Sequence, residues 1–138
     1  MMKRALYILF ATTLFAACDR VYINGNLDGM WRLENVVYPD STAYPSQIFY
    51  SFQRHMTQVS EHNDSTFPIR FLGNLYYDGT ILTMSHFYDF PLESNPATTN
   101  MLKKFHLYSD STIFQVQSLD EEWLIMKSEE RIYTLRKW

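Results

Sequence analysis

Cysteine is almost absent from the 138 residues, because Cys18 is the only one. A disulfide needs two cysteines, so we expect a fold held by its hydrophobic core. Glycine is scarce too: the four glycines form no glycine-rich phosphate loop, and the chain has no Gly-x-Ser-x-Gly nucleophile elbow. We therefore expect no enzyme chemistry and no cofactor.

Positive charge is also in short supply. The chain has 12 Lys and Arg residues against 15 Asp and Glu residues, for a formal net charge of −3 at pH 7. Nucleic-acid binding needs a clustered positive footprint, and the Lys and Arg residues here are not clustered. We expect no nucleic-acid partner.

The first seventeen residues have three zones. Residues 1–4 are short and basic, residues 5–15 are apolar except for Thr12 and Thr13, and Ala16 and Ala17 are small. A permanent transmembrane helix needs about 20 apolar residues, so the run is too short to be one. The pattern is typical of a secretory signal peptide over residues 1–17.

The sequence Leu14-Phe15-Ala16-Ala17-Cys18 resembles the bacterial lipobox, in which a cysteine is lipidated and becomes the new N-terminus. The alternative is an ordinary signal peptide that leaves Cys18 as a free thiol, a liability in an oxidising compartment. We favour lipidation. Residues 18–26 would then form a lipidated N-terminus and tether, and the acyl chains would hold the protein on a membrane of the cell envelope, expected to be the outer membrane. Asp19 is followed by Arg20, which leaves the membrane face open between periplasm and surface.

Removal of residues 1–17 leaves 121 residues, enough for one domain, over 27–138. Loss of Lys3 and Arg4 brings the net charge to −5, and 20 of the remaining residues are aromatic. Such side chains bury large areas, so the predicted core is aromatic.

Alternating apolar residues predict strands at 28–38, 67–77, 80–88, 111–119, 122–128 and 131–137. In the first of these, Trp31, Leu33 and Val37 are expected on one face. Residues 47–60 predict a strand bent by a bulge near Arg54 and His55. The Asp-Gly pair after Tyr77 predicts a hairpin. Residues 97–106 predict one short helix. Seven or eight antiparallel strands joined by tight turns indicate an all-β fold, either an up-and-down barrel or a small sandwich.

The pattern Leu27-x-Gly29-x-Trp31-x-Leu33 resembles the Gly-x-Trp signature of lipocalins and, more closely, the small lipocalin-like lipoproteins of Bacteroides-type bacteria. The similarity continues through Phe49-Tyr50-x-Phe52-Gln53, Leu102-Lys103-Lys104-Phe105, Phe114-x-Val116-x-x-Leu119, Leu124-Ile125-Met126 and Tyr133-x-Leu135-Arg136-Lys137-Trp138. The resemblance implies an antiparallel up-and-down barrel with Trp31 at its closed end. It also implies a basic side chain of the last strand across the indole, for which Arg136 and Arg131 are candidates. A domain of 121 residues is short for a lipocalin, which argues against a roomy cavity.

Seven large side chains are expected to point into the barrel: Trp31, Tyr50, Phe52, Phe71, Met84, Phe114 and Tyr133. They have two interpretations, a packed core or contacts to a ligand. Tyr50 and Tyr133 are the more informative pair, because each buried hydroxyl group needs a partner that a ligand could supply.

Three Asp-Ser-Thr triplets, around Ser41, Ser65 and Ser111, are similar to the O-glycosylation acceptor of the same bacteria. Turn chemistry explains them equally well, since these side chains bond nearby backbone amides.

The only local cluster of metal-ligand types is Glu61-His62-Asn63-Asp64. A zinc site needs three or four ligands, often in spaced pairs, so we read the cluster as a solvated loop and predict no metal.

Two functions fit these observations. The first is a membrane-anchored lipocalin-like lipoprotein that binds a small apolar or amphipathic ligand at the open end of its barrel. The second is a filled barrel that docks on another envelope protein or a glycan, with Trp123, Ile125 and Trp138 as an exposed aromatic patch.

Overall fold

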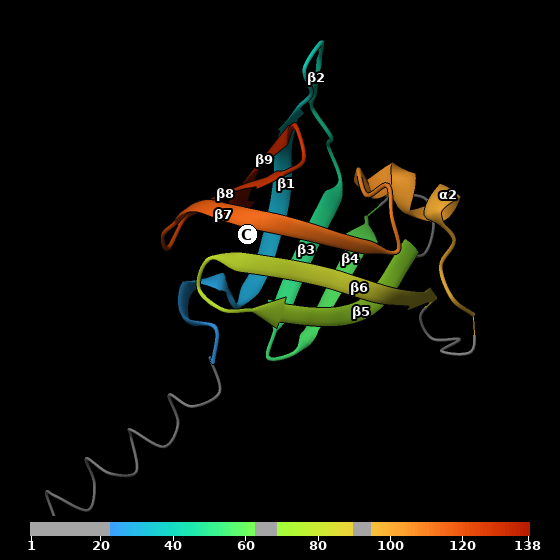
Figure 1. Cartoon of the computed structure of the whole chain (residues 1–138), viewed down its shortest axis with the longest axis horizontal. Helices are drawn as coiled ribbons and strands as arrows, with labels where there is room; N and C mark the ends of the chain where they lie inside the picture. Colours follow the sequence, from blue (N-terminus) through green and yellow to red (C-terminus); the bar gives the residue numbers. More distant parts are fainter. Residues whose placement is uncertain (1–22, 63–68, 90–94) are drawn as a thin grey trace, which may run out of the picture.

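Apart from one two-residue strand, the strands of the protein follow one another round a single antiparallel sheet in the order of the sequence (Figure 1). The computed structural model describes residues 23–62, 69–89 and 95–138. Its elements are η2 (Gly25–Leu27), β1 (Gly29–Val37), β2 (Thr42–Ala43), β3 (Ile48–Gln53), β4 (Met56–Glu61), β5 (Ile69–Tyr77), β6 (Ile81–Asp89), α2 (Thr99–Leu102), η3 (Lys103–Phe105), β7 (Ser111–Leu119), β8 (Trp123–Ser128) and β9 (Arg131–Lys137).

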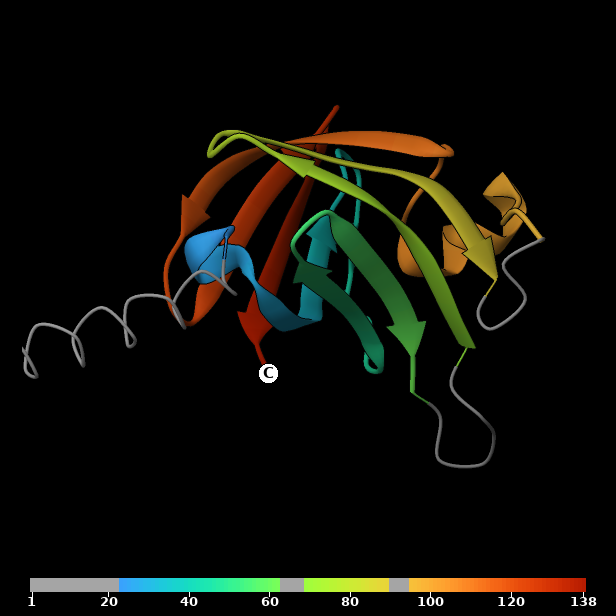
Figure 2. The same ribbon diagram turned by 90° about the horizontal axis from the view of Figure 1, so that it is seen from below.

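The sheet closes into a barrel because the last strand pairs with the first. Strand β9 pairs antiparallel with β1 from Trp31 opposite Lys137 to Val37 opposite Ile132. The two-residue β2 only extends the outer end of β1, so eight strands form the wall. Figure 2 shows these strands curling round a common interior. The structure confirms the predicted up-and-down barrel and excludes the sandwich.

Aspartate side chains fix two of the hairpin turns. Asp78 accepts hydrogen bonds from the backbone amides of Thr80 and Ile81, at 2.9 and 2.7 Å, and these bonds lower the pKa of its carboxyl group. Asp120 accepts in the same way from Glu122 and Trp123. The turn predicted from Asp78 and Gly79 is therefore confirmed, with the Asp side chain bonding the next backbone amides as turn chemistry requires.

The predicted long strand over 47–60 is wrong, because the chain folds back in its middle. Strands β3 and β4 pair with each other from Ile48 opposite Glu61 to Gln53 opposite Met56. The expected bulge at Arg54 and His55 is instead a two-residue hairpin turn, with Arg54 at φ 54°. Two-residue hairpins favour positive φ, which non-glycine residues adopt only at a cost, so a turn at Arg54 and His55 has no glycine to mark it in the sequence.

The inward face of β1 also differs from the prediction at its end. Val36 is fully buried, whereas Val37, which was expected inside, is 39% exposed. The register with β9 shifts between Leu33 and Asn35. One extra residue of β1 therefore separates inward-facing Leu33 from the next inward-facing residue, Val36. An irregularity of this kind exchanges the faces of all the residues that follow it.

The predicted short helix near residues 97–106 is present as α2 followed by η3. Thr98 caps the start, since its side chain accepts a hydrogen bond from the amide of Met101. His106 ends the segment in the left-handed conformation at φ 63°. Leu102 and Phe105 are fully buried, whereas Met101 is exposed. Within the described part of the chain, no helix is long and apolar enough to cross a membrane.

Candidate functional site: the mouth of the barrel

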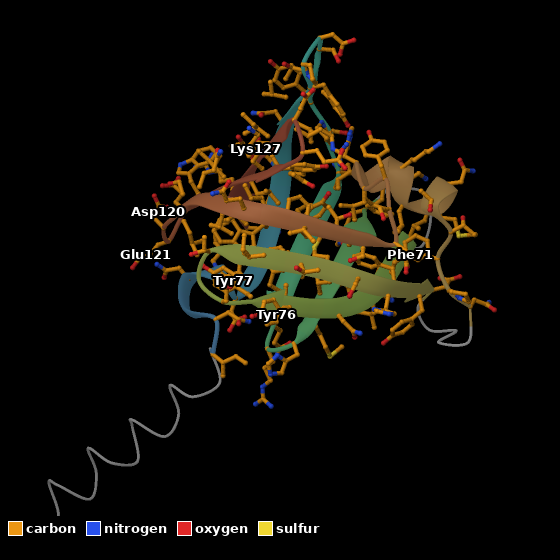
Figure 3. The ribbon with its side chains drawn as sticks, in the orientation of Figure 1. Phe71, Tyr76, Tyr77, Asp120, Glu121 and Lys127 are labelled. Atoms are coloured by element: carbon orange, nitrogen blue, oxygen red, sulfur yellow. The ribbon has the colours of Figure 1, made fainter. Side chains whose placement is uncertain are left out.

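The barrel has two different ends. Hairpin turns at residues 54–55, 78–80 and 120–122, together with η2, lie at one end, which we call the η2 end. The segment α2–η3 and the turn at Glu129 lie at the other, which we call the helix end. In Figure 3 the labelled Asp120 and Glu121 mark the first and Phe71 lies near the second.

Trp31 closes the η2 end. Its indole nitrogen donates a hydrogen bond to the carbonyl oxygen of Leu27 at 2.8 Å, and its side chain is fully buried. The ammonium group of Lys137 lies 4.4 Å from the centre of the indole ring. The same group donates to the carbonyl oxygens of Asn26 and Asp28, at 2.9 and 2.6 Å. A cation over the indole therefore locks η2 to the last strand.

The expectation that Arg136 or Arg131 would cross Trp31 is wrong. Arg136 lies on the outer face, 5.4 Å from the ring centre of Trp123, and Arg131 stacks on Tyr108 at 4.7 Å near the helix end. Lys137 takes the place because the pairing of β1 and β9 sets it directly opposite Trp31.

Gly29 explains the glycine of the Gly-x-Trp pattern. Its φ is +129°, and a Cβ atom added there would lie 3.0 Å from the ammonium nitrogen of Lys137. A side chain at this position would both strain the backbone and displace the cation from Trp31.

All the residues predicted to face the interior do so, and all are buried: Trp31, Tyr50, Phe52, Phe71, Met84, Phe114 and Tyr133. Phe114 and Tyr133 make an edge-to-face pair with ring centres 5.0 Å apart. Burial alone fits the packed-core interpretation, and their role as ligand contacts stays a prediction.

The hydroxyl groups of Tyr50 and Tyr133 already have protein partners. Tyr50 donates to the carbonyl oxygen of Phe105, and Tyr133 donates to that of His106. The Phe105 ring in turn packs edge-to-face on Phe71, with ring centres 5.8 Å apart. The segment η3 therefore packs on the interior residues and covers the centre of the helix end.

A pocket of about 410 Å³ opens at this rim. Its lining comes from the loop after η3, from the start of β7 and from the hairpin between β8 and β9: Tyr108, Ser109, Ser111, Thr112, Ile113, Ser128, Glu129 and Arg131. The pairing of β7 with β8 begins only at Gln115 opposite Lys127, so the first residues of β7 have no β8 partner. We call this space the mouth pocket. Its volume lies within the usual range of about 300–1,000 Å³ for small-molecule sites.

Arg131 is the cation of the mouth pocket. Its side chain is only 16% exposed, and its Nε donates to the hydroxyl oxygen of Tyr133 at 3.1 Å. The guanidinium lies over the Tyr108 ring, and its Nη1 contacts the carboxylate of Glu129 at 3.3 Å. Burial acts to lower the pKa of Arg131, but the hydrogen bond to Tyr133 and the electrostatic interactions with Tyr133, Glu129 and Tyr108 together raise it, so the side chain stays charged.

Three neutral groups complete the rim beside Arg131. The hydroxyl groups of Tyr38 and Tyr108 are hydrogen-bonded, and Tyr38 also lies 2.6 Å from Nδ1 of His106. Burial lowers the pKa of His106 and raises the pKa of Tyr38. Burial likewise raises the pKa of Tyr133. Tyr38, His106 and Tyr133 are therefore neutral near pH 7, and they offset none of the positive charge of Arg131.

Thr112 brings a buried hydroxyl group to the same pocket. The residue is 4% exposed, and its Oγ1 has no hydrogen-bond partner among the described residues. Buried hydroxyl groups are nearly always bonded to protein or water. An unbonded hydroxyl group in a residue that lines a pocket would gain a hydrogen bond from a ligand atom placed within its reach.

Sequence reasoning missed the mouth pocket, although a signal for it was present. Thr112 stands two residues before inward-facing Phe114, Ser128 two residues after Met126, and Arg131 two residues before Tyr133. The period-2 alternation that placed the apolar residues inside also places these polar residues inside. Polar side chains at inward positions near strand ends predict a polar mouth.

The other sequence candidates lie away from this pocket or on its edge. Ser41 is exposed beside β2, and Ser111 is exposed on the pocket rim, while Ser65 and Cys18 lie outside the described residues. Glycosylation and lipidation at these positions stay predictions. His62 packs against Phe49 with ring centres 4.7 Å apart. Over residues 23–62, 69–89 and 95–138, no three His, Cys, Asp or Glu side chains are arranged to hold a metal.

A smaller pocket of about 270 Å³ lies on β3, β4 and β5: Ser51, Phe52, Gln53, Met56, Thr57, Gln58 and Leu72. It offers no charged side chain. The predicted outer aromatic patch is partly exposed. Trp138 is 70% exposed and Trp123 is 36% exposed, while Ile125 is half-buried.

Comparison with known proteins gives two solved structures of the same fold. A lipocalin-like protein from Bacteroides uniformis has 23% sequence identity and a TM-score of 0.67, covering 83% of this chain and 100% of that one. An uncharacterised protein from Bacteroides eggerthii has 19% identity and a TM-score of 0.65, covering 81% of this chain and 99% of its own. No curated protein matched the chain. Residues 13–138 match the family model described as a lipocalin-like domain.

Proposed function

The chain belongs to the lipocalin-like domain family, and we propose that it is a binding protein whose ligand occupies the mouth pocket. Lipocalin-like domains typically bind ligands and do no chemistry. The ligand would be small and amphipathic, since the pocket combines Tyr108 and Ile113 with hydroxyl groups and a cation.

The observation that carries this proposal is the contrast between the interior and the rim. Large side chains fill the barrel, and η3 is hydrogen-bonded onto them through Tyr50 and Tyr133. The rim holds a pocket of about 410 Å³ built from two separate parts of the chain, residues 108–113 and 128–131. A few converging polar groups in a concave site are the usual mark of ligand binding.

Native mass spectrometry of the protein purified gently from its host tests this proposal. We expect a stoichiometric small-molecule adduct that is lost on denaturation. Ser111→Trp, at the exposed rim, should fill the pocket and abolish the adduct. Ser118→Trp on the same strand, also exposed but outside the pocket lining, is the matched control and should retain it. A clean mass, together with no uptake of small amphipathic compounds when they are offered, would contradict the proposal.

We also propose that the protein is tethered to a membrane of the cell envelope through lipidated Cys18. The support is the sequence: a basic start, a short apolar run and two alanines that precede the only cysteine. Metabolic labelling with an alkyne fatty acid should mark the wild-type protein and leave Cys18→Ser unlabelled. Equal labelling of both proteins would remove this part of the proposal.

A second candidate function is docking on another envelope component through the outer face. The filled interior and the exposed Trp138 favour it. Trp138 packs edge-to-face on Phe49 with ring centres 5.2 Å apart, which holds the exposed ring in place. Cross-linking in cells should then give a partner that is lost in Trp138→Ala and retained in Ser111→Trp.

A further inference from the structure

We infer that the ligand of the mouth pocket is a compact organic monocarboxylate held by Arg131 and Thr112. This inference rests on the proposed function and specifies the chemistry of its ligand.

The guanidinium group of Arg131 is incompletely paired. The guanidinium is largely buried, and most of its neighbours are neutral: the Tyr133 hydroxyl group, the Tyr108 ring and the network of Tyr38 and His106. The one carboxylate near it, on Glu129, is 78% exposed and 3.3 Å away. Exposed ion pairs contribute little, whereas a buried cation requires a well-placed anion. A ligand anion inside the pocket would meet that requirement.

The hydroxyl group of Thr112 is the second group that a carboxylate ligand would bond. Thr112 lines the same pocket, and its hydroxyl group is buried without a partner in the described part of the chain, so a rotation about χ1 would bring it to a ligand. A carboxylate only accepts hydrogen bonds, and a hydroxyl group can donate one. One carboxylate oxygen can therefore accept from Thr112 while the planar group faces the guanidinium of Arg131, the geometry in which arginine binds carboxylates.

The charged side chains of the pocket distinguish a monoanion from a dianion such as phosphate. Arg131 is the only Lys or Arg among the lining residues, and Glu129 stands on the same rim. A second negative charge on the ligand would find no second cation and would be repelled by Glu129. The pocket therefore favours a single negative charge.

The packed interior limits the size of the apolar part of the ligand. Phe114 follows Thr112 on the inward face of β7, Tyr133 follows Arg131 on β9, and both are fully buried. Neither ring lines the pocket, and both belong to the packed core, so the interior offers no space for a long acyl chain. Tyr108 and Ile113 offer apolar contacts at the rim, which suit a short or aromatic body.

The test is a nuclear magnetic resonance titration of the ¹⁵N-labelled full chain at constant ionic strength and neutral pH. The probes are phenylacetate, its neutral isostere phenylacetamide, inorganic phosphate and dodecanoate. We expect phenylacetate to shift the amides of residues 108–113 and 128–131. Phenylacetamide and phosphate should bind at least about 10-fold more weakly, which corresponds to about 1.4 kcal/mol. Dodecanoate should bind no more tightly than phenylacetate, because its tail has no interior site.

Two variants separate the roles of the two residues. Arg131→Gln should weaken phenylacetate binding at least about 10-fold. Arg136→Gln, on the outer face of the same strand, is the matched control and should change it less than about twofold. Thr112→Val keeps the shape and removes the hydroxyl group, so it should weaken binding severalfold and also raise the free energy of unfolding of the ligand-free protein. Thr112→Val decides the matter if Arg131→Gln does not fold.

Each other outcome overturns the inference in a recognisable way. Equal binding of phenylacetate and phenylacetamide at these amides would refute the carboxylate while leaving the pocket as a binding site. Phosphate binding as tightly as phenylacetate, or dodecanoate binding more tightly than phenylacetate, would refute the compact monoanion. No shift with any probe would refute the inference, and the proposed function would fall with it only if native mass spectra also showed no adduct.

Discussion

Replacement of Lys137 by Met tests the closed η2 end of the barrel. Methionine keeps the length and the apolar stem of the side chain but removes the ammonium group. That group makes two hydrogen bonds, to the carbonyl oxygens of Asp28 at 2.6 Å and Asn26 at 2.9 Å, and lies 4.4 Å from the ring centre of Trp31. The substitution therefore removes three contacts and creates no large cavity.

The expected loss follows from these contacts and from their partial exposure. Hydrogen bonds to charged groups contribute about 1.5–3 kcal/mol each when shielded, and a cation over an indole about 0.5–1 kcal/mol at an exposed site. Burial lowers the pKa of Lys137, so the desolvation of its ammonium group offsets part of the stabilisation from these contacts. Water can also reach the exposed Asn26 carbonyl. We expect a net loss of about 2 kcal/mol in the free energy of unfolding.

Urea unfolding followed by tryptophan fluorescence measures this loss as a lower midpoint with an unchanged slope. Lys127→Met is the matched control, because Lys127 is exposed on β8 and its charge should matter by less than about 0.5 kcal/mol. A Lys137→Met loss no larger than that of the control would refute the claim that the lysine locks η2 to the barrel.

Three more predictions follow from backbone strain and from burial. Gly29→Ala should destabilise the protein by about 1–3 kcal/mol, because φ of +129° is strained for alanine; an unchanged urea midpoint would contradict this. Arg54→Gly should stabilise it by about 0.5–1 kcal/mol, because glycine accepts φ of 54° without strain, and thermal unfolding would show a lower melting temperature if the reasoning is wrong. Burial lowers the pKa of His106 below 6.5, so the unfolded chain binds the proton more readily and stability falls as the pH drops below that value. His106→Asn, which tolerates the left-handed backbone, should flatten this decline in unfolding measured between about pH 5 and 8, and an equally steep decline would exclude His106 as its source.

The alternation of side chains predicted most of the barrel. Strand β7 begins and ends where the pattern placed it, and the strands after Asp78 and Asp120 begin where turn chemistry placed them. These features are local: side chains point to alternate faces along a strand, and an Asp side chain bonds amides two or three residues ahead. The resemblance to lipocalins decided between barrel and sandwich, and the pairing of β1 with β9 confirmed it.

Local patterns failed where the backbone departs from regular alternation. The register shift after Leu33 moved Val36 inside and Val37 outside, and the strained turn at Arg54 divided one predicted strand into two. Neither departure involves a glycine or a proline, which are the residues that usually mark such places in a sequence. The alternation does contain the polar mouth, because it places Thr112, Ser128 and Arg131 on the inward face near the strand ends.

The sequence by itself therefore determined the strands, most of their inward faces and the identity of Trp31 as a core residue, because these depend on neighbours along the chain. Only the tertiary structure decided which basic residue crosses Trp31, because strand pairing sets Lys137 opposite it. It alone brought Tyr38 to His106 across 68 residues and built the mouth pocket from two segments, residues 108–113 and 128–131. Such contacts depend on the register of strands and the closure of the barrel, and no local pattern in the chain encodes either.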